Sequence, residues 1–520
     1  MPVIPRFQPV RSSPEKRLEL LLASGGDTRL DLDPSTGRNR YHCTPRPSGA
    51  VPFGSCTASS VSQRGFAAAE AVLRQVRAVH DHRLAAEELA ESIRRRIVAH
   101  FSLAADVDVV LAASGTDVEL LALVLAAGRS MARMISILVG PREVGSGTPL
   151  AAAWRHYDRR SPSGLGVEPG EPVDRCLATR VALEGVVLRT AEGAVRSGSD
   201  LAAEVSDAVA AAKAAQAIAF LHVVAHSKTG VHAPSLPQVE QLVEANDHLV
   251  VLLDAAQGRL GRRRIRECVE AGYLVTLTGS KFYGGPPFSG ALLVPSRFRP
   301  SERGIRLPPG LGAYFSACEV PPSWREQRRT LAPEPNWGTL LRWTAALADV
   351  DAYYALPWEL RRRILRHFED AVPSVFAGSE AIELLPPYRP PVQLEARGIE
   401  AMTTVFGFFV GPRHRRQRFD QARLRGLYGD LATDLSATAA GADRELLGHE
   451  YHLGQPVEIG PDAAVLRVAI GGELVTRIAC DESLGATLDV RLAWLRNQLE
   501  GLCGKIEHLA ARRAAGSRIT

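Results

Sequence analysis

The chain has 520 residues, of which 46% are hydrophobic and 23% charged, and its formal net charge is +5. These values are typical of a soluble globular protein with room for two domains. They argue against a nucleic-acid partner, because the basic clusters are short and acidic residues are spread throughout. Seven irregularly spaced cysteines predict a reducing compartment. Without a signal-peptide core or a membrane-spanning apolar run, we expect a cytoplasmic protein with no membrane partner.

Residues 1–65 are rich in Pro, Gly, Ser and Arg, which predicts an N-terminal arm or cap. Within it, Phe53–Ser60 carries small hydroxyl residues that either line a site or form a turn-rich packing segment. Helical periodicity then extends from Phe66 to Phe101.

Short apolar runs next alternate with helical patterns such as Leu201–Ala214 and Pro237–Ala245. The strands are expected at Val107–Leu111, Ile135–Val139, Gly185–Arg189, Ala217–Ala225, His248–Leu253, Leu274–Leu277 and Ala291–Val294. This alternation predicts an open, mostly parallel α/β sheet. Ligands bind beyond the carboxyl ends of such strands.

The remainder of the chain is expected to form a second, α+β region. A proline-rich section ends at Pro335, and a long helix is expected over Thr339–Leu365, with a break allowed at Pro357. Strands are then predicted near 403–410 and 464–470, helices near 415–429 and 484–500, and a frayed tail from Arg512. No internal repeat or Cys/His zinc spacing occurs, and we expect no metal site.

Lys281 is the first candidate for chemistry. The chain contains only five lysines, and this one lies in a segment crowded with Gly, Pro and hydroxyl residues, between Thr278 and Ser280 on one side and Gly284 on the other. Lysine can lose its proton and form a Schiff base, which arginine cannot. The alternative is an ordinary solvated side chain.

Two further candidates follow predicted strands. Ser114-Gly115-Thr116-Asp117 begins a helix and forms either an anion site or a simple N-cap. Asp254 ends the clearest strand and begins the run Asp-Ala-Ala-Gln257. A carboxylate there needs a partner, such as a protonated heteroaromatic nitrogen, unless it only caps the next turn.

Two candidates lie later in the chain. Asn336-Trp-Gly-Thr339 opens the long helix and is otherwise a plain N-cap. Arg467 lies in an expected strand, where a guanidinium needs an anion. A substrate carboxylate and a structural salt bridge both satisfy that need.

The order of these motifs resembles fold-type I pyridoxal-phosphate (PLP) enzymes, and more closely the class V aminotransferase and selenocysteine lyase/cysteine desulfurase group. The resemblance covers roughly residues 65–480. It implies a three-layer α/β/α PLP-binding domain over 66–338 and a smaller α+β domain over 339–520 that begins with the linking helix. It also implies a homodimer with shared active sites.

The resemblance assigns roles by position. Lys281 would form the internal aldimine, Asp254 would pair with the pyridinium nitrogen, and Arg467 would bind the substrate carboxylate. The phosphate contacts would come from Gly115, Thr116, Thr278, Ser280 and, across the dimer, Thr339. Contacts to the ring oxygen would come from Gln257 and from His226 or Ser227.

Two positions depart from the group. The ring-stacking histidine would fall on Val144, within Glu143-Val-Gly-Ser146, and the catalytic cysteine of the desulfurase branch would fall on Leu453. Leucine cannot act as a sulfur nucleophile, so the usual desulfurase activity is not expected.

The predicted function is therefore a PLP-dependent enzyme acting at the α-carbon of an amino acid or another amine, with aminotransferase as the leading label. A PLP-dependent lyase, decarboxylase or epimerase is the alternative, and a non-catalytic PLP-fold subunit is the third interpretation. The arm and a Gly/Pro/Arg-rich insertion over 140–180 suggest a covered site for a specialised substrate.

Overall fold

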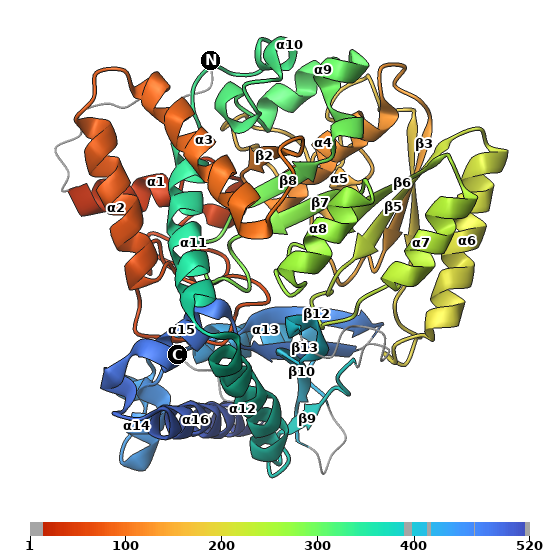
Figure 1. Ribbon diagram of the computed structural model, residues 1–520. Helices are drawn as coiled ribbons and strands as arrows, with labels where there is room; N and C mark the ends of the chain where they lie inside the picture. Colours follow the sequence, from red (N-terminus) through yellow and green to blue (C-terminus); the bar gives the residue numbers. More distant parts are fainter. Residues whose placement is uncertain (1–13, 389–397, 413–417, 462, 515–520) are drawn as a thin grey trace.

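The computed structural model describes residues 14–388, 398–412, 418–461 and 463–514. Its larger part is organised around a sheet of seven strands in the order β2-β8-β7-β6-β5-β3-β4 (Figure 1). The strands are β2 (Asp108–Ala112), β3 (Met134–Val139), β4 (Val181–Val186), β5 (Ile218–Val224), β6 (Leu249–Asp254), β7 (Leu274–Thr278) and β8 (Gly290–Val294). Only β8 is antiparallel to its neighbours, β2 and β7. The carboxyl ends of the other six strands therefore share one edge.

Helices cover both faces of this sheet. One apolar cluster joins the sheet to α4 (Gly115–Ala127) and to the segment 298–331. The other joins the opposite face to α3 (His82–Phe101), α6 (Gly198–Ala214), α7 (Leu236–Ala245), α8 (Arg262–Glu270) and α11 (Trp337–Ala355). Every residue of β2, β7 and β8 is buried, as expected of strands covered on both sides.

Around this three-layer unit lie shorter elements. The N-terminal helix α1 (Pro14–Leu22) and α2 (Gln63–Arg77) pack on α11. Single-turn helices α5 (Thr148–Ala151), α9 (Pro300–Arg303) and α10 (Arg325–Arg328) lie in the connecting segments.

A smaller unit follows α11 (Figure 1). Its antiparallel sheet has the order β12-β13-β10-β9, formed by β9 (Ile382–Leu384), β10 (Val405–Val410), β12 (Gly454–Gly460) and β13 (Ala463–Ala469). Its helices are α12 (Trp358–Phe376), α13 (Gln421–Leu431), α14 (Ala442–Gly448), α15 (Gly472–Cys480) and α16 (Leu488–Ala514). The arm joins this unit, because β1 (Val51–Pro52) pairs in parallel with β11 (Tyr451–His452).

The predicted fold class is confirmed: a mostly parallel α/β/α unit carries a smaller α+β C-terminal unit. The long predicted helix is indeed broken at Pro357, which caps the start of α12. The domain limits at residues 65 and 338 remain predictions.

Three element predictions need correction. The strand expected at Gly185–Arg189 lies at Val181–Val186, where four consecutive exposed residues of an edge strand hide the apolar signal. The helical stretch 66–101 is two helices, because Asp81 accepts hydrogen bonds from the first N–H groups of α3. Helix α16 continues to Ala514, so Arg512 belongs to a helix, while 515–520 and 413–417 lie outside the described residues.

In the part of the chain that the structure describes, no helix combines the length and the apolar character needed to cross a bilayer.

Candidate functional site

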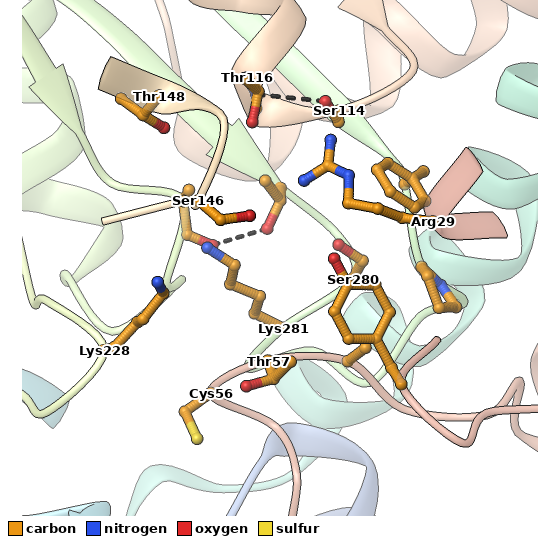
Figure 2. Close-up of a pocket in the computed structure, with 18 of the residues that line it drawn as sticks. Arg29, Cys56, Thr57, Ser114, Thr116, Ser146, Thr148, Lys228, Ser280 and Lys281 are labelled. Atoms are coloured by element: carbon orange, nitrogen blue, oxygen red, sulfur yellow. Dashed lines mark hydrogen bonds between the residues drawn. The ribbon is translucent and has the colours of Figure 1, made fainter. Parts of the chain in front are cut away.

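A cavity opens at the edge of the sheet where the parallel strands end (Figure 2). The volume it encloses is about 100 Å³. Its wall is formed by residues of the arm, of the loops after the strands and of the smaller unit: Arg29, Tyr41, Cys56, Thr57, Ala58, Ser114, Gly115, Thr116, Glu119, Gly145, Ser146, Thr148, Lys228, Asp254, Ala256, Thr278, Ser280, Lys281, Pro287, Phe288 and Gln455. Segments far apart in sequence thus form one site.

Lys281 is presented to this cavity by a tightly folded loop after β7. Within the loop, the N–H of Gly285 donates to the carbonyl of Gly279 at 3.0 Å. A Cβ on either glycine would lie 2.5 Å from Ala346 of α11, so only glycine allows this approach. Burial lowers the pKa of Lys281, and the nearby Asp254 carboxylate partly opposes this effect. The amine therefore loses its proton more readily than an exposed lysine.

Asp254 ends β6 and lines the same cavity. Its Oδ1 accepts a hydrogen bond from the N–H of Ala256 at 3.0 Å. Its Oδ2 receives no hydrogen bond from any residue that the structure describes. The alternative, in which Asp254 only caps the next turn, holds for one oxygen, and the other oxygen remains available.

The start of α4 forms another part of the wall. Ser114 and Asp117 make a capping box in which Ser114 Oγ accepts from the N–H groups of Thr116 and Asp117. The predicted N-cap is confirmed. Gly115 and Thr116 also line the cavity, so the positive end of the helix dipole faces it. Binding of an anion there stays a prediction.

The capping carboxylate is itself deeply buried. Burial raises the pKa of Asp117 to about 6, although the hydroxyl of Tyr157 donates a hydrogen bond to it. Tyr157 belongs to the insertion over 140–180, which therefore reaches the start of α4.

Thr278 and Ser280 both line the cavity, but their hydroxyl groups differ. Thr278 Oγ1 donates to the carbonyl of Ala256 at 2.6 Å, so its proton is already used. Ser280 makes no side-chain hydrogen bond to another described residue. Ser280 is thus the better placed of the two to donate to a ligand.

Arg467 does not lie on the cavity wall. It is fully buried, and its guanidinium donates to the carbonyls of Gln455 (2.8 Å) and Lys228 (3.0 Å) and to the Thr57 hydroxyl (2.8 Å). The salt bridge expected as the alternative is absent too, since none of these described acceptors is charged. Carbonyl oxygens and a hydroxyl satisfy the arginine instead.

Gln257 and His226 also lie behind the wall. Gln257 donates to the carbonyl of Cys56 at 3.1 Å and accepts from Arg259 at 3.1 Å. His226 packs edge-on against His232, and burial lowers its pKa to about 3, so it is neutral. Neither residue belongs to the cavity wall, and the ring-oxygen contacts predicted for both remain predictions.

Thr339 is buried within its own chain. Its N–H donates to Asn336 Oδ1, and Arg342 ties α11 to the arm by donating to the carbonyls of Leu22 and Gly25. The side chain of Thr339 is 0% exposed. Its predicted contact with a neighbouring subunit, and the homodimer itself, remain predictions.

The two departures from the resembled group also lie away from the cavity. Val144 belongs to the core of the larger unit, while Gly145 and Ser146 form the wall beside it. Leu453 belongs to the core of the smaller unit. The aromatic side chains on the wall are Tyr41 and Phe288, among the described residues.

Several wall residues were missed or left open. Cys56, Thr57 and Ala58 line the cavity, so the Phe53–Ser60 segment contributes to the site and is not packing alone. Arg29 and Lys228 were not predicted. The scarcity of lysine could have indicated Lys228, but no local signal indicated Arg29.

Arg29 reaches the side of the cavity where Ser114 and Thr116 lie (Figure 2). Its guanidinium forms a bidentate ion pair with Asp27, through Nε at 2.8 Å and Nη2 at 2.5 Å, and lies over the ring of Phe288. Its charge is therefore already balanced.

The acidic side chain of Glu119, which is also on the wall, has a histidine close by. Glu119 lies 2.9 Å from His222 Nδ1, and the other ring nitrogen of His222 lies 2.8 Å from Ser136 Oγ. Burial raises the pKa of Glu119, and His222 opposes the shift.

No protein-family model matches this sequence, and no curated protein matches it either. Solved structures do resemble the fold. A cysteine desulfurase from Thermococcus onnurineus NA1 is 14% identical with a TM-score of 0.48, covering 88% of this chain and 95% of its own. The glutamate decarboxylase domain of a Vibrio parahaemolyticus protein is 14% identical with a TM-score of 0.49, covering 88% and 80%. A C-DES mutant with glycine covalently linked to its PLP cofactor is 13% identical with a TM-score of 0.48, covering 87% and 97%.

Proposed function

We propose that this cavity binds pyridoxal phosphate and that the protein acts at the α-carbon of an amino acid or a related amine. The observation that carries the proposal is the presence of Lys281 and Asp254 on the wall of one cavity. The ε-amino group of Lys281 makes no hydrogen bond or ion pair with any described residue, and its pKa is lowered. It shares the cavity with the free oxygen of Asp254. An amine of this kind is a nucleophile near neutral pH.

The residues on the wall fit this cofactor. Lys281 would hold its aldehyde carbon, and Asp254 Oδ2 would accept a hydrogen bond from its protonated ring nitrogen. The start of α4 at Gly115 and Thr116, with the hydroxyl of Ser280, would hold its phosphate. Thr278, Gln257 and Thr339 are engaged within the protein, so their predicted contacts are not needed for this fit.

When bound, the cofactor supplies an aldehyde that condenses with primary amines, releasing water, and a protonated ring that withdraws electrons from the α-carbon of the amine. Asp254 would keep the ring nitrogen protonated, because a nearby carboxylate favours the charged form. Lys281, once the substrate amine has replaced it, would move a proton at the substrate α-carbon.

Within this class we propose an aminotransferase, on the resemblance stated for the sequence. The buried leucine at position 453 removes the thiol that the usual desulfurase reaction requires. A lyase, decarboxylase or epimerase would use the same residues, and the chemistry of the site does not separate these reactions.

The test is to load the purified protein with PLP and mix it with a panel of amino acids without an acceptor. Conversion of the cofactor to its pyridoxamine form supports an aminotransferase. Release of ammonia, carbon dioxide or a side-chain fragment, with the starting spectrum restored, supports a lyase. A racemised amino acid supports an epimerase. Lys281→Ala should abolish every change, whereas Lys213→Ala, on the exposed face of α6, should change nothing. A protein that takes up no PLP would refute the proposal.

A further inference from the structure

Lys228 lines the same cavity as Lys281 (Figure 2). It lies in the loop between β5 and α7, and its backbone is fixed on both sides. Its N–H donates to the carbonyl of Glu143 at 2.8 Å, and its carbonyl accepts from Arg467 Nη1 at 3.0 Å. The Lys228 side chain therefore extends from a backbone that is held on both sides, and it points into the cavity.

The adjoining loop is held by a buried ion pair. Arg189 Nε lies 2.5 Å from Glu143 Oε1, and the hydroxyls of Ser227 and Thr229 both donate to Glu143 Oε2. Glu143 thus has its oxygens occupied and cannot serve as a close counter-ion for Lys228. Its carboxylate fixes the loop.

The ε-amino group of Lys228 makes no hydrogen bond and no ion pair within the described parts of the chain. Burial and the charges of Arg467 and Lys281 together lower its pKa to about 7, against a weaker opposing effect of Glu143. The amine of Lys228 therefore has no close partner among the described residues, and burial destabilises its charged form.

Other ionisable groups on the cavity wall lie close to a partner. Arg29 is paired with Asp27, and Glu119 lies 2.9 Å from His222 Nδ1. Asp254 partly opposes the lowering of the Lys281 pKa by burial. Lys228 has no such partner among the described residues, and a single negative charge on a bound ligand would neutralise its charged amine.

Arg467, the residue expected to bind a carboxylate, is unsuited to that task here. Three neutral oxygen acceptors occupy its guanidinium, and Thr57, Gln455 and Lys228 separate it from the cavity. We propose that Lys228 binds the carboxylate of the substrate, with Arg467 acting as the positioning residue that fixes the Lys228 loop. The carboxylate belongs to an amino acid in so far as the proposed PLP function holds.

This assignment has a measurable consequence. Carboxylate binding stabilises the charged form of Lys228, so above its free pKa the complex must take up a proton. Affinity for a carboxylate should be constant below about pH 7 and fall by about tenfold per pH unit above it. The uptake appears as a dependence of the calorimetric binding heat on the buffer.

The experiment titrates short unreactive carboxylates that lack an amine, propionate, 3-methylbutanoate and 3-phenylpropionate, into PLP-loaded and cofactor-free protein. The matching amides serve as uncharged controls. The protein variants are Lys228→Met, Lys228→Arg and the surface control Lys213→Met. Binding is measured by calorimetry between about pH 6 and pH 9, where Lys228 but not arginine changes charge.

We expect Lys228→Met to bind the carboxylates at least about tenfold more weakly, the loss typical of a charged hydrogen bond, and to lose proton uptake. Lys228→Arg should keep binding and lose the pH dependence. Equal carboxylate affinity and equal pH profiles for wild type and Lys228→Met would overturn the inference, as would an absence of carboxylate binding to wild type. Failure of PLP loading, with carboxylate binding at Lys228 intact in the cofactor-free protein, would refute the proposed function alone.

Discussion

Gly290 provides a sharp test of how the site is assembled. It begins β8 and lies against the start of α4. A Cβ at this position would lie 2.4 Å from the carbonyl carbon of Ser114, 2.5 Å from its oxygen and 2.9 Å from the nitrogen of Gly115. The indole of Trp343 also donates to the carbonyl of Gly290 at 2.8 Å, so the strand cannot easily move away. Gly290→Ala must therefore displace the start of α4.

The magnitude follows from the kind of contact. All three close atoms belong to the backbone, so no side chain can rotate to make room. Overpacking of a well-packed core costs about 1–3 kcal/mol, and we expect the upper end of that range here. With an unfolding entropy of about 2.1 cal/mol/K per residue, a chain of 520 residues loses roughly 1 °C of its unfolding midpoint for each kcal/mol, so the midpoint should fall by about 3 °C.

Differential scanning calorimetry on Gly290→Ala and on the control Gly185→Ala measures this effect. Gly185 lies in the edge strand β4, where an added Cβ meets only the Pro141 side chain at 3.4 Å, an ordinary contact. Its replacement should change stability by no more than about 0.5 kcal/mol. The affinity of Gly290→Ala for PLP should fall as well, because Gly115 and Thr116 move with α4. Equal unfolding temperatures for the two variants would show that α4 and β8 do not meet as described.

Two further variants probe charge and the arm. Burial lowers the pKa of Lys228 in the folded protein to about 7, below the ordinary lysine value of 10.5. Between pH 7 and pH 10.5 the unfolded chain therefore binds more protons than the folded protein, so the stability of the wild type rises with pH over this range. Cofactor-free Lys228→Met should therefore unfold at a higher temperature than wild type at pH 7 and below, with the difference vanishing near pH 10.5; a pH-independent difference would contradict the assignment. Arg342→Met removes the donors to Leu22 and Gly25. It leaves these buried carbonyls without their partners, which costs about 1–3 kcal/mol, and it should expose the arm to limited proteolysis. Arg329→Met, an exposed control, should be cleaved like wild type, and equal cleavage of Arg342→Met would show that the arm is held by other contacts.

The sheet was predictable from sequence because its strands are short apolar runs buried on both faces. Residues 249–254 and 290–294 show this most clearly. The strand at 181–186 was misplaced, since an edge strand with exposed side chains lacks that signal. Local patterns therefore identify central strands better than edge strands.

The candidate site was only partly predictable. Lys281, Asp254, Gly115 and Thr116 follow strand ends, and parallel topology brings such positions together. The sequence predicted an anionic partner for Arg467, because a local pattern cannot reveal the carbonyl oxygens that accept hydrogen bonds from its guanidinium. Arg29, in turn, reaches the cavity only because the arm folds back over α11.

The role of Lys228 also could not be predicted from the sequence. The sequence places it in a short loop, but its role depends on the positions of Glu143 and Arg467, which come from distant segments. Such tertiary contacts decide which of several lysines has an unpaired amine. They have no signature within the loop itself.

Borohydride reduction of the PLP-loaded protein tests the central claim most directly. The reagent converts the bond between an amine and the cofactor aldehyde into a stable secondary amine, and peptide mapping then locates it. The site geometry predicts that the label falls on the peptide containing Lys281 and is lost in Lys281→Ala. Label on Lys228, or no label at all, would contradict the assignment of Lys281.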